Sequence, residues 1–162
     1  MVIRKVAFVK RRSTHFLRAA LLVIAAVVLA ACIFALPLGI SLDETGYYRP
    51  ILFGLYVPAI PFFFALYQAF TLLGYIDTNN AFSGLSVTAL KKIKYCALTI
   101  SALFAAGMPY IFYAGDRDDA PGVIVGGLVI TGASLVIATF AGVLQKLLQN
   151  AIAIKSENDL TV

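Results

Sequence analysis

Four long stretches without a charged residue dominate this 162-residue chain. They contain 24, 27, 21 and 26 residues and run over residues 19–42, 50–76, 95–115 and 120–145. The hydrocarbon core of a bilayer is about 30 Å thick, so a helix needs roughly 20 apolar residues to cross it. Only helices or closed barrels satisfy their backbone groups in lipid. The sequence therefore predicts an all-α, polytopic membrane protein with four transmembrane helices.

The composition leaves little room for a separate soluble domain. The chain is 61% hydrophobic and 13% charged, and this charged share is about half of that in an ordinary soluble domain. We expect one four-helix transmembrane domain over residues 1–162. Its predicted parts are a basic cytoplasmic N-terminus (1–16), spans at about 17–41, 51–76, 94–115 and 120–146, and a cytoplasmic tail (147–162).

The basic residues are distributed unequally between the two ends of the predicted bundle. Of the 13 lysines and arginines, six precede the first stretch, three precede the third and two follow the fourth. Only Arg49 and Arg117 lie in the other two loops. The positive-inside rule then places both termini in the cytoplasm. This topology accounts for the net charge of +5, so we predict no direct contact with nucleic acid.

The two outer loops are acidic instead, and we treat their carboxylates as candidate contacts for an extracellular ligand or cation. The residues concerned are Asp43, Glu44, Asp116, Asp118 and Asp119. A second interpretation stays open for Asp119, because an aspartate two residues before a proline suits the N-cap of the fourth helix.

The spans contain no grouping of side chains with recognisable chemistry. No Asp, Glu, Lys, Arg or His lies deep inside a span, whereas ion-coupled carriers usually place such a residue near the midplane. His15 has no second ligand nearby, and Cys32 and Cys96 fall at different depths. We therefore predict no catalytic residue, no cofactor, no metal site and no disulfide, and we do not expect an enzyme.

Small residues and prolines are unevenly placed along the spans. The fourth span contains Gly122-x-x-x-Gly126 and Ala138-x-x-x-Gly142, a spacing that lets helices approach closely. We expect this face to be buried inside the bundle or to form a homo-oligomer interface. All six prolines fall in the outer half. Because proline removes a helix hydrogen bond, this half is where we would look for a ligand cavity if the chain has one. The alternative is that prolines are simply commoner in membrane helices.

The end of the chain is polar after an apolar helical stripe that continues past Lys146. We predict that the helix breaks at Lys155, and that Lys155, Glu157, Asn158 and Asp159 are available to bind a partner. The alternative is a helix stop whose acidic side chains bond back to the loop lysines.

Several segments resemble the bacterial four-span membrane family called domain of unknown function 2975. They are Phe82-Ser83, Leu90–Tyr95, Asp118–Gly122, Leu144–Leu148 and Ile154–Val162, of which the terminal Glu-Asn-Asp-Leu-Thr-Val is the most specific. The resemblance covers nearly the whole chain. It implies a multi-pass protein of the bacterial cell (cytoplasmic) membrane, often encoded beside a small helix-turn-helix regulator. It supplies no established activity and no catalytic residue.

Two functional hypotheses from different classes follow. The first is a non-enzymatic regulatory, sensing or immunity-type interaction protein. Its partners would be the lipid bilayer and either a cytoplasmic helix-turn-helix regulator or another membrane protein. The alternative is a small oligomeric transporter or channel, with a vestibule in the proline-bent outer half.

Overall fold

The computed structural model describes the backbone of residues 2–44, 46, 48–78 and 80–160, and the side chains of the same ranges from residue 14 onward. Part of the predicted basic N-terminus therefore lies outside the described side chains. The described residues form helices and no strand. The helical segments are α1 (Val2–Ala30), the π-helical turn η1 (Ala31–Ala35), α2 (Leu36–Leu42), α3 (Arg49–Gly54), α4 (Tyr56–Asp77), α5 (Gly84–Arg117) and α6 (Pro121–Leu160).

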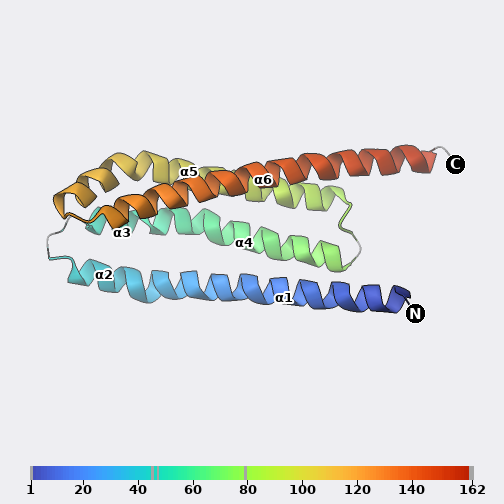
Figure 1. Cartoon of the computed structure of the whole chain (residues 1–162), viewed down its shortest axis with the longest axis horizontal. Coiled ribbons are helices and arrows are strands. Elements are labelled where there is room, and N and C mark those ends of the chain that lie inside the picture. Colours follow the sequence, from blue (N-terminus) through green and yellow to red (C-terminus); the bar gives the residue numbers. More distant parts are fainter. Residues whose placement is uncertain (1, 45, 47, 79, 161–162) are drawn as a thin grey trace.

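These segments join into long rods that lie side by side along the longest axis of the molecule (Figure 1). Within the described ranges, four helices are long and apolar enough to cross a membrane: Thr14–Leu42, Arg49–Asp77, Gly84–Arg117 and Pro121–Leu160. The prediction of an all-α, four-span architecture is confirmed. Both ends of the chain lie at the same end of the bundle (Figure 1).

The most extensive packing joins α5 to α6, followed by α4 to α5, whereas α1 makes fewer contacts and makes them with α4. On α6, the buried residues facing α5 are Gly127, Ser134, Ala138 and Ala141. Their spacing follows the repeat of seven that keeps one helix face on its neighbour. A Cβ on Gly127 would lie 3.0 Å from Met108 Sδ, so the absence of a side chain there permits the close approach of the two helices.

The small residues of the fourth span thus divide into two groups. Ala138 is buried, and Gly142 lies beneath the side chain of Lys94, as expected for a packed face. Apart from the adjacent backbone of α6 itself, no atom of the described residues lies within 4 Å of a Cβ built on Gly122 or Gly126. The Gly122-x-x-x-Gly126 pair therefore makes no close helix contact within one chain. Its use in a homo-oligomer stays a prediction.

The π-helical turn in the first span follows from Pro37. The N–H of Leu36 donates to the carbonyl of Ala31, five residues earlier. A π-helical hydrogen bond joins a carbonyl to the N–H five residues later. The carbonyl of Cys32 would therefore need the N–H of residue 37, which is a proline and has none. The hydroxyl of Tyr56 on α4 donates to this carbonyl at 2.9 Å. A backbone acceptor that would be costly to leave unsatisfied in lipid is thus satisfied by a neighbouring helix.

Two helix ends differ from the sequence-based expectation. Asp119 has a φ of 48° and ends α5, with the Ala120 N–H donating to the Gly115 carbonyl at 2.9 Å. This left-handed residue closes a helix C-terminus, so its interpretation as the N-cap of α6 is wrong. The predicted break at Lys155 is also wrong, because α6 continues to Leu160. No glycine or proline follows Gly142 to interrupt it.

Candidate functional site

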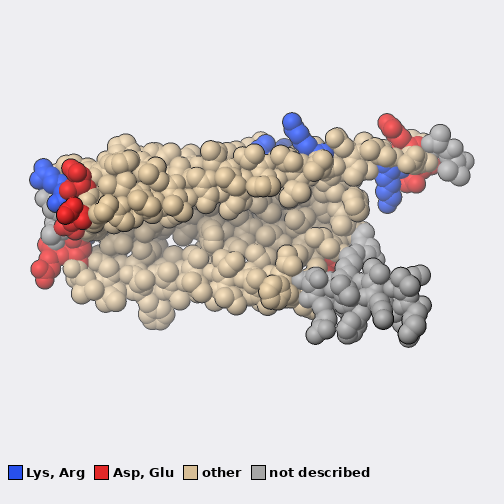
Figure 2. Space-filling model, in the orientation of Figure 1, with Lys and Arg blue, Asp and Glu red and all other residues tan. Residues whose placement is uncertain are grey.

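On the face seen in Figure 2, a long section without charged side chains separates the charges at the α2–α3 end of the bundle from the Lys and Arg side chains further along the α5–α6 pair. Several hydroxyls within the spans donate hydrogen bonds to helix carbonyls. Thr71, Thr99, Thr131 and Thr139 each donate to the carbonyl four residues earlier. Ser101 of α5 donates to the Thr131 carbonyl of α6 at 3.1 Å. These groups thus serve the helix backbone or link two helices.

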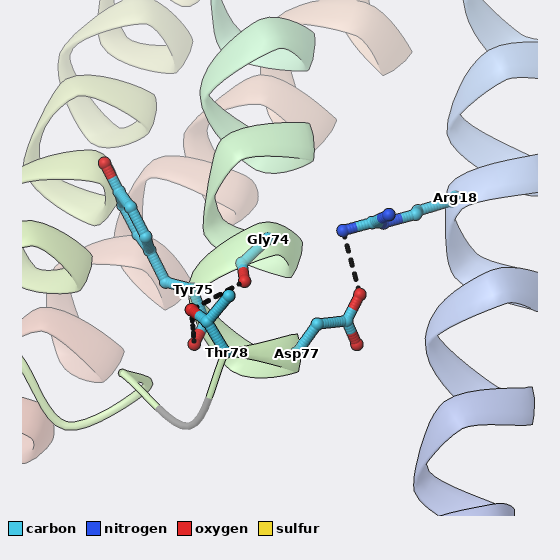
Figure 3. Close-up of polar contacts among 5 residues, drawn as sticks. All are labelled: Arg18, Gly74, Tyr75, Asp77 and Thr78. Atoms are coloured by element: carbon cyan, nitrogen blue, oxygen red, sulfur yellow. Dashed lines mark hydrogen bonds and ion pairs between the residues drawn. The ribbon is translucent and has the colours of Figure 1, made fainter.

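An ion pair connects α1 to α4 (Figure 3). It lies at the end of the bundle that carries both chain termini (Figure 1), which is called the inner end below after the predicted topology. Arg18 Nη2 lies 2.8 Å from Asp77 Oδ2, and the two side chains are 29% and 27% exposed. The guanidinium carbon also lies 5.3 Å from the centre of the Phe70 ring. Gly74 faces the same guanidinium, at 3.8 Å from Nη2 to the position of a Cβ. Arg18 is therefore held by charge and by an aromatic face together.

Sequence reasoning missed this pair, although a signal for it was present. Arg18 is the last charged residue before the first uncharged stretch, and Asp77 is the first one after the second stretch. Two consecutive spans run antiparallel, so these residues lie at the same depth. Depth alone did not show that the two helices are neighbours at that level.

We expect reversal of the charges to separate the ion pair from a simple loss of packing. Asp77→Lys should place two cations together and loosen α1 from α4, and Arg18→Asp should place two carboxylates together. Arg18→Asp combined with Asp77→Arg should restore most of the thermal stability. Each single variant should lose about 1 kcal/mol, because pairs that remain partly exposed are screened by solvent. Unfolding in detergent measures this, and equal losses in the single and double variants would contradict it.

At the outer end, Asp43 organises the loop between α2 and α3. Its Oδ1 accepts from the Gly46 N–H at 3.0 Å, and its Oδ2 accepts from the N–H groups of Tyr48 and Arg49 at 3.0 Å each. The side chain is buried. The carboxylate that we had treated as a candidate ligand contact thus satisfies the backbone at the start of α3.

Tyr48 brings the two outer loops together. Its hydroxyl is buried, makes no hydrogen bond of regular geometry among the described residues, and faces the Asp118 carboxylate. Burial raises the pKa of Tyr48, and the nearby carboxylates of Asp118 and then Asp43 raise it further. The hydroxyl therefore stays neutral beside these acids. The structure thus gathers Asp43 and Asp118 around one ring from opposite halves of the chain.

The remaining outer acids are solvent-facing. Glu44, Asp116, Asp118 and Asp119 are all exposed. Across the described ranges, no group of three or more His, Cys, Asp or Glu side chains is arranged to hold a metal ion. Whether these acids contact an external ligand stays a prediction.

An apolar cavity of about 320 Å³ lies in the outer half between α3–α4 and α5. Pro50 and Pro58 line it together with Phe104, Gly107 and Tyr110. This is the region where the prolines had indicated a cavity. A second groove of about 450 Å³, which the sequence had not indicated, lies at the inner end and is lined by Leu72, Phe82, Leu90, Leu144 and Leu147 among others. Neither lining contains a charged residue.

The last turns of α6 project past the α4–α5 connection (Figure 1). All four residues predicted to bind a partner are exposed there: Lys155, Glu157, Asn158 and Asp159. Both signs of charge are visible at this tip (Figure 2). Because these residues belong to a helix, their Cβ atoms have fixed relative positions.

The fold and the distribution of charge define a four-helix integral membrane protein. The chain belongs to the family described as "Protein of unknown function (DUF2975)", whose model matches residues 13–162, as the sequence resemblance had indicated. It is similar to the "Uncharacterized membrane protein YoaS" of Bacillus subtilis (strain 168). The two are 60% identical over 158 residues, which cover 94% of this chain and 99% of that protein. No solved structure matches the chain.

Proposed function

We propose that this protein is a non-enzymatic interaction protein of the bacterial cytoplasmic membrane, of a regulatory, sensing or immunity type. In this proposal the inner end of α6 is presented to a protein partner in the cytoplasm. The proposal rests on one observation: α6 runs without interruption from Pro121 to Leu160, and the polar residues of its last turns are exposed.

The length of α6 exceeds what spanning requires. At 1.5 Å per residue, its 40 residues extend for about 60 Å, roughly twice the thickness of the hydrocarbon core. The uncharged stretch ends at Gln145, and the following fifteen residues reach roughly 20 Å further. A projecting helix of this length offers a surface to a soluble protein.

The distribution of basic residues supports the cytoplasmic placement of this helix. Eleven of the 13 lysines and arginines belong to the end of the bundle that carries both termini. The positive-inside rule assigns that end to the cytoplasm. A small helix-turn-helix regulator is the partner class that the family resemblance implies, and it is the first to look for.

The interior gives less support to the alternative of a transporter or channel. The span hydroxyls described above bond to helix carbonyls, and both cavities have apolar linings. A pathway for a polar solute needs polar groups that are available to replace its water. We therefore favour the interaction protein.

The proposal is tested by a photo-crosslinking amino acid at Ser156 in the native host. We expect one specific cytoplasmic protein to be captured, and its capture to be lost when Glu157→Ala and Asp159→Ala are combined. A matched control combines Glu44→Ala with Asp116→Ala, which removes the same charge from the opposite end and should leave capture unchanged. Capture of lipid and copies of this chain alone would overturn the proposal and favour an oligomeric permeation pathway.

A further inference from the structure

Three lysines gather at the inner end of the α5–α6 pair: Lys91, Lys94 and Lys146. Lys94 immediately precedes the uncharged stretch 95–115, and Lys146 immediately follows the stretch 120–145. They therefore mark the same boundary of the hydrocarbon core from two adjacent helices. This is the depth at which the phosphates of phospholipids lie.

Lys94 is held against α6 by the absence of a side chain at Gly142. A Cβ built on Gly142 would lie 3.5 Å from Lys94 Cδ, 3.6 Å from Cε and 3.8 Å from Nζ. The aliphatic part of the lysine thus crosses the backbone of α6, and its ammonium lies 5.8 Å from the centre of the Tyr95 ring. A charge fixed in this way loses less conformational entropy on binding than a freely moving lysine.

Helix geometry places the other two lysines on the same side of the α5–α6 pair as this ammonium. Lys146 follows Gly142 by four residues and so lies one turn further along the same side of α6. Lys91 precedes Lys94 by three residues on one side of α5. Since α5 and α6 run antiparallel, these two steps lead in the same direction. Blue side chains are seen together over this part of the pair, with no red beside them (Figure 2).

No carboxylate compensates these charges within the part of the chain that the structure describes. None of the three lysines forms an ion pair there, and Asp77 at the same end is engaged by Arg18. Glu157 lies eleven residues beyond Lys146, which is about 16 Å along the helix. The mutual repulsion of the lysines favours an anionic partner at this position.

We propose that Lys91, Lys94 and Lys146 bind the phosphate of an anionic phospholipid at the edge of α5 and α6. The depth of the site selects a membrane lipid over soluble phosphate, because acyl chains surround both helices at the level just beyond Lys94. Basic sites between transmembrane helices are known to take such head groups. The site follows from the geometry alone, and only the leaflet, the inner one, rests on the orientation proposed above.

The test is native mass spectrometry of the detergent-purified protein with added phosphatidylglycerol, using phosphatidylcholine as the neutral lipid. We expect Lys94→Gln combined with Lys146→Gln to weaken phosphatidylglycerol binding about 25-fold, which is about fivefold for each charge. The matched control combines Lys92→Gln with Lys155→Gln and should change it less than about twofold. Lys92 lies two residues from Lys94, on the opposite side of α5.

Two further measurements make the outcome decisive. Gly142→Leu keeps every charge but displaces the Lys94 stem, and it should weaken lipid binding several-fold. Lys146→Gln alone changes an exposed residue. If the variant that carries Lys94→Gln fails to fold, this single variant tests the site, and it should weaken phosphatidylglycerol binding about fivefold. Equal losses in the two double variants would show unspecific attraction and overturn the proposal. Displacement of the lipid by millimolar inorganic phosphate would overturn the choice of a lipid.

Discussion

Gly127→Leu is expected to separate α5 from α6 and to cost about 3 kcal/mol or more of the free energy of unfolding, at the upper end of the range for overpacked cores. Gly127 is buried, and a Cβ alone would lie 3.0 Å from Met108 Sδ and 3.3 Å from Ile111 Cδ1. A leucine needs three more carbon atoms in this space. Since the α5–α6 contact is the most extensive in the bundle, no other interface can compensate for its loss.

The matched control is Gly132→Leu on the same helix. Beyond the adjacent backbone of its own helix, no described atom lies within 4 Å of a Cβ at Gly132, so the same chemical change should alter stability by less than about 0.5 kcal/mol. Cys96 is a free and buried thiol, and its reaction with a maleimide on heating, in a Cys32→Ser background, reports unfolding directly. Equal destabilisation by both substitutions would contradict the packing described for α6.

Asp43→Ala is expected to have the second largest effect, a loss of about 2 kcal/mol. The substitution removes the acceptors of three backbone N–H groups at 3.0 Å. Hydrogen bonds to a charged group contribute roughly 1.5–3 kcal/mol each, and water entering the open outer loop recovers part of this. The ordering of α3 and the position of Tyr48 should be lost together.

Glu44→Ala provides the control for Asp43→Ala, because it removes a neighbouring carboxylate that is exposed. It should leave the free energy of unfolding unchanged within about 0.5 kcal/mol. Asp43→Asn keeps an acceptor oxygen and should fall between the two. The thiol assay of Cys96 measures all three variants. A stable Asp43→Ala variant would mean that the loop is held by other contacts.

The architecture could be predicted because charge is excluded from the bilayer core. The absence of charged residues located the four spans, and Ser83, directly before Gly84, is of a residue type that commonly caps a helix N-terminus. Its Oγ accepts from the Ser86 N–H at 3.4 Å. Hydroxyls within a span likewise bond to helix carbonyls, because lipid offers them no other partner. These conclusions depend only on local sequence and on the solvent.

The features that were missed depend on which elements are neighbours. The ion pair of Arg18 with Asp77 requires α1 to lie on α4, and the contact of Tyr48 with Asp118 requires two loops from opposite halves to meet. Asp43 was interpreted as a ligand contact because the turn that directs three N–H groups at it has no sequence signature of its own. Side-chain polarity identified these residues but did not reveal their partners.

The end of α6 shows a different cause of error. The run of polar residues from Lys155 was interpreted as a helix stop, although no glycine or proline occurs there. Polar residues with good helix propensity continue a helix that apolar packing has already established. The partner-binding hypothesis survives this correction and becomes more specific, since the Cβ atoms of the four residues now have fixed relative positions on a helix.

The central claim is that the projecting end of α6 lies in the cytoplasm, and cysteine labelling in intact cells tests it most directly. In a background with Cys32→Ser and Cys96→Ser, Glu44→Cys and Ser156→Cys are each exposed to a membrane-impermeant maleimide. We predict that the Glu44→Cys variant reacts in intact cells, and that the Ser156→Cys variant reacts only after the membrane is permeabilised. Labelling of the Ser156→Cys variant in intact cells, with protection of the Glu44→Cys variant, would contradict the account.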